Sequence, residues 1–436
     1  MIFPFKSKWF WQNPLDPVDH IDQKIDRVIA DRSYRLAIGL SVSDCFQKLR
    51  GCLVVGQGHG KYLRLKKAIA AQQQLPETVQ NEIRRVSRLA EPSLLDTIAV
   101  VADLSAFQAG LVEELKSHAG KYVDRLLLVA CNDPGVWMKD IDGMPVYRPI
   151  CEPVSLAEAC GINVIDSFPT RDLMAGGNGR GVDALPMWLL LADRSETVAR
   201  EAKLIFSVGQ RTQATFLPAS DGLDSELPDL KVAFGSGTSI LRTVVESAAG
   251  HGQVGDSQLV QLYVDGKIDD DIMLKLKMTK ESEKPNIGDS EIGDSEIWNQ
   301  VRLADLVRTA VVFIVDEISD AINDQKIELG SGNVQIDCPQ EIAGIFINQF
   351  QRRWPRVSVD GVDFRGLKCG DLTAATTAFL GLACVDQLPV NVPWVTGAGS
   401  QKILGRLSPG TPSNWRRLLC EMADFQPPAM RLRDAV

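Results

Sequence analysis

Three short apolar segments stand near the start of this 436-residue chain: RLAIGLSVSD (35–44), GCLVVG (51–56) and KYLRLKKAIA (61–70). Turn-forming residues separate them, and the last turn is GQGHG (56–60). Apolar segments of this length between such turns predict three β-strands that begin as an antiparallel hairpin. The glycines do not form a Walker phosphate loop, because Val55 and Tyr62 stand where that loop requires Gly and Ser or Thr.

Downstream of these strands, predicted helices and strands alternate. Helical patterns cover residues 77–88 and 104–119, and buried-strand patterns are RLLLVACND (125–133) and INVIDSF (162–168), the latter after a helix that ends at Gly161. The stretch KLIFSVGQRTQATFLPAS (203–220) predicts two strands around a polar turn. Alternation of this kind predicts an α/β fold.

The second half of the chain repeats the alternation. We predict a strand, a Gly-rich turn and a helix in KVAFGSGTSILRTVVESAAG (231–250), a helix over 301–323, a strand in KIELGSGN (326–333), a helix over 340–354 and a helix from Asp371. The repeat GDSEI at Gly288 and Gly293 predicts an exposed loop. The predicted divisions are an N-terminal extension (1–33), a first α/β lobe (34–229), a second α/β lobe (230–400) and a C-terminal tail (401–436).

The composition favours a small-molecule ligand. The chain has 47 Lys and Arg against 56 Asp and Glu, a formal charge of −9 that argues against nucleic acid or an anionic membrane as the partner. Nine cysteines without a CxxC pair, and four scattered histidines, predict reduced thiols and no metal site built from these residues. We find no signal peptide and no run of about 18 apolar residues. These observations predict a cytoplasmic location.

Three glycine-rich turns are the candidate binding elements. The turns at 235–239 and 330–333 each adjoin a predicted strand, where free backbone N–H groups would cradle phosphate, although glycines there also form simple turns. The third is RDLMAGGNGRG (171–181), whose arginines would bind a carboxylate, unless it is a solvated surface loop. We expect the three turns to line one cleft between the lobes.

Two blocks resemble the anhydro-N-acetylmuramic acid kinases. GINVIDSFPTRDLMAGGNG (161–179) resembles their segment G-I-x-V-V-x-D-F-R-x-x-D-x-A-x-G-G-Q-G, and residues 369–398 resemble their tail G-D-x-x-E-A-x-A-F-A-x-L-A…G-x-P-x-N-L-P-x-V-T-G-A. The resemblance implies a two-lobed actin-like ATPase fold with the nucleotide between the lobes. It also implies ATP and Mg²⁺ as cofactors, and phosphorylation of the anhydro-sugar with hydrolytic opening of its 1,6 ring.

The resemblance assigns site residues by position. Those implied to bind the sugar are Phe168, Arg171, Asp172, Gly176, Gly177, Asn178 and Gly179. Those implied to bind the nucleotide are Gly39, Gly209, Gly235, Gly237, Thr238, Gly330, Gly332 and Asn333. Because the family's substrate carries a lactyl carboxylate, we expect Arg171→Ala to weaken the binding of an acidic sugar. We expect sugar and nucleotide as partners, with room for a homodimer.

Three motifs of the family are altered in this chain. The opening phosphate loop falls on residues 39–48 without its second Gly, its Thr and its Asp-Gly, and the H-G-Q-T motif falls on residues 132–135. The family's general base falls on Ala233, which cannot accept a proton. Two functions therefore stand open, a sugar kinase and a nucleotide- or sugar-binding regulatory protein. We expect kinase turnover to be absent, or at least about a hundred-fold below that of a chain with Asp at position 233.

Overall fold

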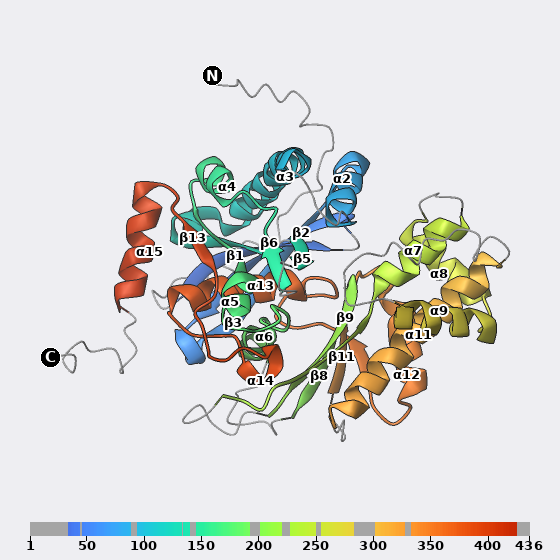
Figure 1. Ribbon diagram of the computed structural model, residues 1–436. Coiled ribbons are helices and arrows are strands. Elements are labelled where there is room, and N and C mark those ends of the chain that lie inside the picture. Colours follow the sequence, from blue (N-terminus) through green and yellow to red (C-terminus); the bar gives the residue numbers. More distant parts are fainter. Residues whose placement is uncertain are drawn as a thin grey trace.

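The computed structural model describes residues 34–43, 46–88, 94–132, 134–139, 145–191, 201–219, 227–249, 254–282, 301–327 and 333–424. The predicted N-terminal extension, the predicted loop at the GDSEI repeat, and Gly330 and Gly332 lie outside these residues. Figure 1 shows two lobes side by side, each built around one β-sheet.

The first sheet has the strand order β13-β7-β4-β1-β2-β3. Its strands are β1 (Tyr34–Ser43), β2 (Lys48–Gln57), β3 (Arg64–Gln74), β4 (Leu126–Asn132), β7 (Asn163–Asp166) and β13 (Arg406–Ser408). The first three form an antiparallel meander, as predicted, and β4 and β7 continue the sheet in parallel with β1.

The second sheet repeats this topology, in the order β10-β9-β8-β11-β12. Its strands are β8 (Lys203–Val208), β9 (Arg211–Leu217), β10 (Lys231–Ser236), β11 (Asn333–Asp337) and β12 (Val359–Gly361). Here too a three-stranded antiparallel meander is followed by two parallel strands. Two lobes with this shared topology make up the actin-like ATPase fold that the sequence predicted.

The position of β11 differs from the prediction over 326–333. This strand begins at Asn333, and its buried apolar residues are Val334 and Ile336, which alternate with polar neighbours. The apolar pair in KIEL suggested an earlier strand, but Ile327 lies outside β11, and it is the alternation in NVQID that fits a strand with one face in the core.

Helices cover both faces of the first sheet. On one face lie α2 (Glu77–Arg88), α3 (Leu94–Ala119) and α4 (Pro153–Cys160), and on the other lie α6 (Ala184–Leu191) and α13 (Leu372–Val385). The shorter elements are η1 (Gly60–Tyr62), η2 (Gly120–Arg125), the hairpin of β5 (Val136–Lys139) and β6 (Pro145–Arg148), α5 (Phe168–Met174), α14 (Pro393–Thr396) and α15 (Pro412–Asp424). Among the described helices, none combines the length and the apolar composition needed to cross a membrane.

Helices of the second lobe lie on the side of its sheet away from the first lobe (Figure 1). They are α7 (Thr238–Ala248), α8 (Asp256–Asp265), α9 (Asp270–Ser282), α11 (Leu303–Asp324) and α12 (Ala343–Arg353). The side chains that face them from the sheet, such as Phe206, Ala214 and Ala233, are buried in one core with α7 and α11. The opposite face of this sheet is therefore left for the first lobe.

The chain returns to the first lobe at its end. Helix α13 packs against β1 and β4, β13 pairs with β7, and α15 contacts β4 and β7. Residues 372–424 thus belong with the first sheet, whereas the predicted second lobe extended to residue 400. The same core that holds α13 includes Ile205, Leu217 and Leu230 of the second lobe, so the two lobes share apolar packing.

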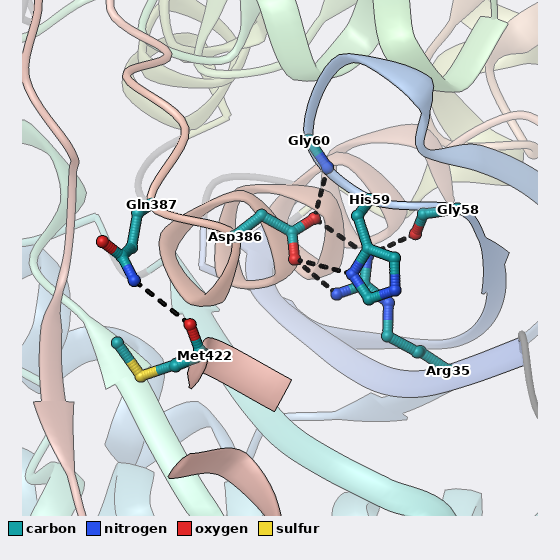
Figure 2. Close-up of polar contacts among 7 residues, drawn as sticks. All are labelled: Arg35, Gly58, His59, Gly60, Asp386, Gln387 and Met422. Atoms are coloured by element: carbon teal, nitrogen blue, oxygen red, sulfur yellow. Dashed lines mark hydrogen bonds and ion pairs between the residues drawn. The ribbon is translucent and has the colours of Figure 1, made fainter. Parts of the chain in front are cut away.

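A buried ion pair fixes the end of α13 to the first hairpin (Figure 2). Arg35 of β1 donates from Nη1 to Asp386 Oδ1 (2.6 Å) and from Nη2 to Oδ2 (2.9 Å), and the Gly60 amide donates to Oδ2 (2.6 Å). Burial alone would raise the pKa of Asp386, but hydrogen bonds from His59 and Arg35 bring it below its ordinary value. The predicted turn at 56–60 therefore has a structural role.

We predict that Asp386→Ala lowers the free energy of unfolding by about 3–5 kcal/mol, because it leaves the buried Arg35 guanidinium without its carboxylate. Urea denaturation measures the change. Asp363→Ala is the matched control, because the Lys368–Asp363 pair is exposed on both sides (57% and 69%), and pairs of that kind contribute about 0–1 kcal/mol. Similar losses in the two variants would contradict the assigned importance of the buried pair.

Candidate functional site between the two lobes

The segment that follows α5, residues 175–183, is called the glycine loop, and it surrounds the carboxylate of Asp172. This side chain is fully buried, and its Oδ2 accepts a hydrogen bond from the Gly179 amide (2.9 Å) while Oδ1 accepts one from Asn391 Nδ2 (2.8 Å). A Cβ on Gly177 would lie 2.2 Å from Oδ2, so a side chain does not fit at this position. Asp172, predicted to bind the sugar, therefore uses both oxygens to hold the loop.

Among the other residues predicted to bind the sugar, some are buried in the fold and others lie at the surface. Phe168 is buried in the core of the first lobe. Arg171 is exposed and donates from Nη1 to the carbonyl of Ile403 (3.3 Å) in the same lobe. Asn178 is exposed, and its Oδ1 accepts from the Arg180 amide (2.8 Å). The glycines at 176 and 179 have φ of 82° and 71°, which suits their residue type.

The continuation of this loop reaches the second lobe. A Cβ on Gly181 would lie 3.4 Å from the ring of Phe234 on β10, so the backbone runs directly against that strand. Two residues later, Asp183 Oδ1 accepts a hydrogen bond from Nε2 of Gln213 on β9 (3.1 Å). Burial raises the pKa of Asp183, although the bond from Gln213 opposes this shift. The loop thus brings a half-buried carboxylate to the interface between the lobes.

Two arginines meet at the same interface. Burial, and to a smaller extent the nearby charge of Arg211 at the start of β9, together lower the pKa of Arg180 to about 10. Neither guanidinium forms an ion pair or a side-chain hydrogen bond with another residue in the described part of the chain. The sequence pointed to the arginines of this loop as carboxylate ligands; of the two, Arg171 donates to a carbonyl within the first lobe, whereas Arg180 lies at the lobe interface near Arg211.

Strand register decides which side chains face the first lobe. Gln213 pairs with Phe234 and Ala214 pairs with Ala233, and successive residues of a strand point to opposite faces. Phe234 and Gln213 contact the glycine loop, whereas Ala233 is 3% exposed in the core against α11. A carboxylate placed at position 233 would be buried in that core, so this position does not present a base to the first lobe.

A second polar cluster lies further along the same sheet face. On β11, Asp337 accepts a hydrogen bond from the Gly370 amide (2.6 Å), and Arg50 Nη1 lies 3.7 Å from Asp371 Oδ1. Burial raises the pKa of Asp337 to about 7. Asp337 is in register with Ser207, which is in register with Gln213. Two strand spacings, about 10 Å, therefore separate the two polar clusters.

The residues predicted to bind nucleotide make close packing contacts. A Cβ on Gly39 would lie 1.9 Å from the Ala374 carbonyl oxygen, so glycine here lets α13 approach β1. Thr238 donates from its amide (2.7 Å) and its hydroxyl (2.8 Å) to the carbonyl of Gly209. A Cβ on Gly237 would lie 2.4 Å from the same oxygen. The two predicted turns thus pack against each other.

Residues next to Gly237 and Thr238 also make close contacts within the second lobe. The Ser236 amide donates to Glu317 Oε2 on α11 (3.0 Å), and a Cβ on Gly235 would lie 3.4 Å from Ile318. A phosphate at this turn would have to displace these contacts. Asn333 opens β11, and its buried Oδ1 has no hydrogen-bond partner among the described residues. Gly330 and Gly332 lie outside the described residues, so their predicted role stays a prediction.

A cavity of about 640 Å³ lies within the second lobe, lined by Met273, Lys277, Phe313, Asp316, Glu317, Asp320 and Arg353. Glu317 connects it to the end of β10 through the Ser236 amide.

Lys48, at the start of β2, bridges the two lobes. Its Nζ lies 2.5 Å from Glu341 Oε1 and 3.9 Å from Asp256 Oδ2. Neither the cavity nor the bridge could be predicted from the spacing of residues in the sequence, because the residues that form them come from separate elements.

We predict that Gly177→Ala lowers the free energy of unfolding by about 2–5 kcal/mol, because the new methyl group would collide with the buried Asp172 carboxylate and break its hydrogen bonds. Thermal denaturation followed by circular dichroism measures the change. Gly344→Ala on α12 is the matched control, because no atom lies within 4 Å of its Cβ position; we expect an unchanged or higher melting temperature there. Equal behaviour of the two variants would refute the described packing of the loop.

Comparison with known proteins agrees with the resemblance found in the sequence. The family model for anhydro-N-acetylmuramic acid kinase matches residues 291–410. The anhydro-N-acetylmuramic acid kinase of Cupriavidus pinatubonensis is 21% identical over 360 residues, which is 78% of this chain and 90% of the relative. That of Synechococcus sp. is 23% identical over 271 residues, 58% of this chain and 67% of the relative.

Solved structures with partial likeness include two nucleotide-bound proteins. The activator of 2-hydroxyisocaproyl-CoA dehydratase from Clostridium difficile with bound ADPNP has a TM-score of 0.39 at 11% identity, over 80% of this chain and 96% of that one. A ROK family glucokinase from Streptomyces griseus in complex with glucose and AMPPNP has a TM-score of 0.31 at 11% identity, over 79% and 98%. The family model and the curated relatives, together with the motifs at 161–179 and 369–398, support membership of the anhydro-N-acetylmuramic acid kinase family.

Proposed function

We propose that this protein binds an anhydro-amino sugar that carries a carboxylate, and phosphorylates it with ATP at the interface between its lobes. The observation that carries the proposal is the pair Arg180 and Arg211, which come from opposite lobes and form no ion pair with any carboxylate of the described residues. An anion placed there would relieve the repulsion of the two guanidinium groups. Their planar, forked geometry suits a carboxylate.

The neighbouring residues support a sugar as the rest of the ligand. Gln213 and Ser207 stand side by side on the sheet face that meets the glycine loop. Amide and hydroxyl groups both donate and accept hydrogen bonds, as recognition of sugar hydroxyls requires. The loop that faces them is held by Asp172 and Asn391, so the binding groups of the first lobe are fixed before the sugar arrives.

The nucleotide would occupy the second lobe. The cavity beside Glu317 has the volume of a small-molecule site, an apolar floor of Met273 and Phe313, and carboxylates that can accept hydrogen bonds from ribose hydroxyls. Lys48 would have to leave Glu341 for the lobes to separate on this side. The Lys48 side chain is 12% exposed and that of Glu341 37%, so opening on this side breaks a partly buried pair.

The Mg²⁺ that the family implies would be bound mainly by the nucleotide. Among the described residues no group of three or more His, Cys, Asp or Glu side chains is placed to hold a metal ion. Mg²⁺ at phosphate sites usually takes one or two carboxylates and completes its coordination with phosphate oxygens and water. Asp337 and Asp371, which lie together beside Arg50, are the carboxylates that would hold it.

A second candidate function is sugar binding without phosphoryl transfer. The observation that favours it is the turn at 236–239, where the amides of Ser236 and Thr238 already donate to Glu317 and Gly209 instead of being free for phosphate. Release of ADP from Mg²⁺-ATP separates the two functions. A kinase releases ADP in proportion to the added anhydro-sugar, whereas a binding protein retains the sugar and releases no additional ADP.

We predict that Arg180→Ala and Arg211→Ala each weaken the binding of 1,6-anhydro-N-acetylmuramic acid by roughly 10- to 150-fold, the equivalent of about 1.5–3 kcal/mol for a charge-assisted hydrogen bond. Titration calorimetry measures the affinity. Arg171→Ala is the matched control and should bind as the unmodified chain does, since Arg171 contacts Ile403 in the first lobe. The carboxylate-free sugar 1,6-anhydro-N-acetylglucosamine should bind weakly to all four proteins.

Equal affinity of the unmodified chain for the two sugars would contradict the proposed carboxylate site. If only Arg171→Ala weakened sugar binding, the carboxylate site would lie on the exposed side of α5 instead. Failure of the unmodified chain to bind either sugar would contradict the proposed substrate class.

A further inference from the structure

We propose that Asp183 is the general base of the sugar reaction in this chain, accepting the proton of the water that opens the anhydro ring. This inference rests on the proposed function. It answers a question that the altered motifs leave open, because position 233, where the family has its base, carries alanine and faces the core of the second lobe.

The other carboxylates near the lobe interface are committed elsewhere. Asp172 uses both oxygens within the glycine loop. Asp337 accepts the Gly370 amide about two strand spacings away from Gln213, and Asp371 beside it accepts the Lys368 amide (3.0 Å) and lies 3.7 Å from Arg50 Nη1. Asp229 is exposed just before β10. Asp183 remains, on a fixed loop and directed at the other lobe.

The contacts of Asp183 suit a proton acceptor. Its side chain is held by one neutral donor, Gln213 Nε2 (3.1 Å), which is itself positioned by a bond to Thr215 Oγ1 (3.0 Å). No cationic side chain of the described residues forms an ion pair with it. Partial burial and the lack of a paired cation keep the carboxylate more basic than an exposed Asp, as general-base catalysis near neutral pH requires.

The elements that carry Asp183 and Gln213 also carry two arginines. Arg180 lies three residues earlier on the same loop, and Arg211 lies two residues before Gln213 on β9. If these arginines hold the carboxylate of the sugar, their charge is neutralised by the ligand and Asp183 is left facing the ring. The same loop would then orient the substrate and supply the base.

The reaction balances with Asp183 in this role. As the oxygen of a water molecule bonds to the anomeric carbon of the sugar, Asp183 takes the proton that this water releases. The bond between that carbon and the bridging oxygen breaks, and its electron pair stays on the oxygen at C6. This oxygen bonds to the γ-phosphorus of ATP, the bond to the β,γ-bridging oxygen breaks, and ADP leaves with that electron pair. Asp183 then gives its proton to solvent.

The test compares the unmodified chain with Asp183→Asn, Asp183→Ala and the matched control Asp229→Asn. Steady-state release of ADP in the presence and absence of 1,6-anhydro-N-acetylmuramic acid gives kcat, and titration calorimetry gives sugar affinity. We expect kcat of Asp183→Asn to fall by about 10²- to 10⁴-fold, the usual contribution of a general base, with sugar affinity changed less than about three-fold. Asp229→Asn should retain full turnover.

Added formate distinguishes a catalytic from a structural role. A small carboxylate can enter the space left in Asp183→Ala and accept the proton, so formate should restore part of its turnover and leave Asp183→Asn unchanged. Asp183→Glu, which keeps the carboxylate, provides a further comparison if the Asn and Ala variants are unstable. A structural role would predict loss of sugar affinity and no recovery with formate.

The outcomes separate this inference from the proposed function. Sugar-dependent turnover in the unmodified chain that survives in Asp183→Asn would overturn the role of Asp183 and leave the kinase function standing. Absence of sugar-dependent turnover in an unmodified chain that binds the sugar would overturn both, and would favour the binding-protein alternative.

Discussion

Both oxygens of the Asp172 carboxylate are used inside the protein, and the candidate site depends on this one buried group. Its bonds to Gly179 and Asn391 join a loop after β7 to a segment more than 200 residues later in the chain. The loop that they fix carries Arg180 and Asp183 to the second lobe. Without the carboxylate, the Gly179 amide and one of the two N–H groups of Asn391 Nδ2 would lose their acceptor, while the Ser400 carbonyl still accepts from Nδ2 (3.2 Å); this loss makes the loop geometry costly to change.

The two sheets explain why this loop meets a polar surface. Each sheet places helices on its far side, so the near faces are left to each other and to α6 and α13. Residues 372–424, the end of the described chain that returns to the first lobe, supply both Asn391 and the Asp386 that holds Arg35. Packing of this returning segment therefore supports the site as well as the fold.

Local sequence patterns predicted the repeated α/β architecture and the glycine loop, because alternation and turn residues are short-range signals. They did not predict which polar residues would meet, since Arg180 and Arg211 come from different lobes. Glycine is an ambiguous signal. Gly39 and Gly237 resemble phosphate-binding glycines, and the structure shows that they also allow close contacts with Ala374 and Gly209, so their contact with nucleotide stays a prediction. Strand register, which places Ala233 in the core and Gln213 at the interface, also requires the paired strands to be known.

The central claim is that an acidic amino sugar binds between the glycine loop and β9. Hydrogen–deuterium exchange of the full chain, with and without 1,6-anhydro-N-acetylmuramic acid, tests it most directly because it locates the ligand without assuming catalysis. We expect slower exchange in peptides covering residues 176–183 and 211–215, with the cavity residues 313–320 unchanged. Slower exchange confined to 313–320, or no change at saturating sugar, would contradict the account.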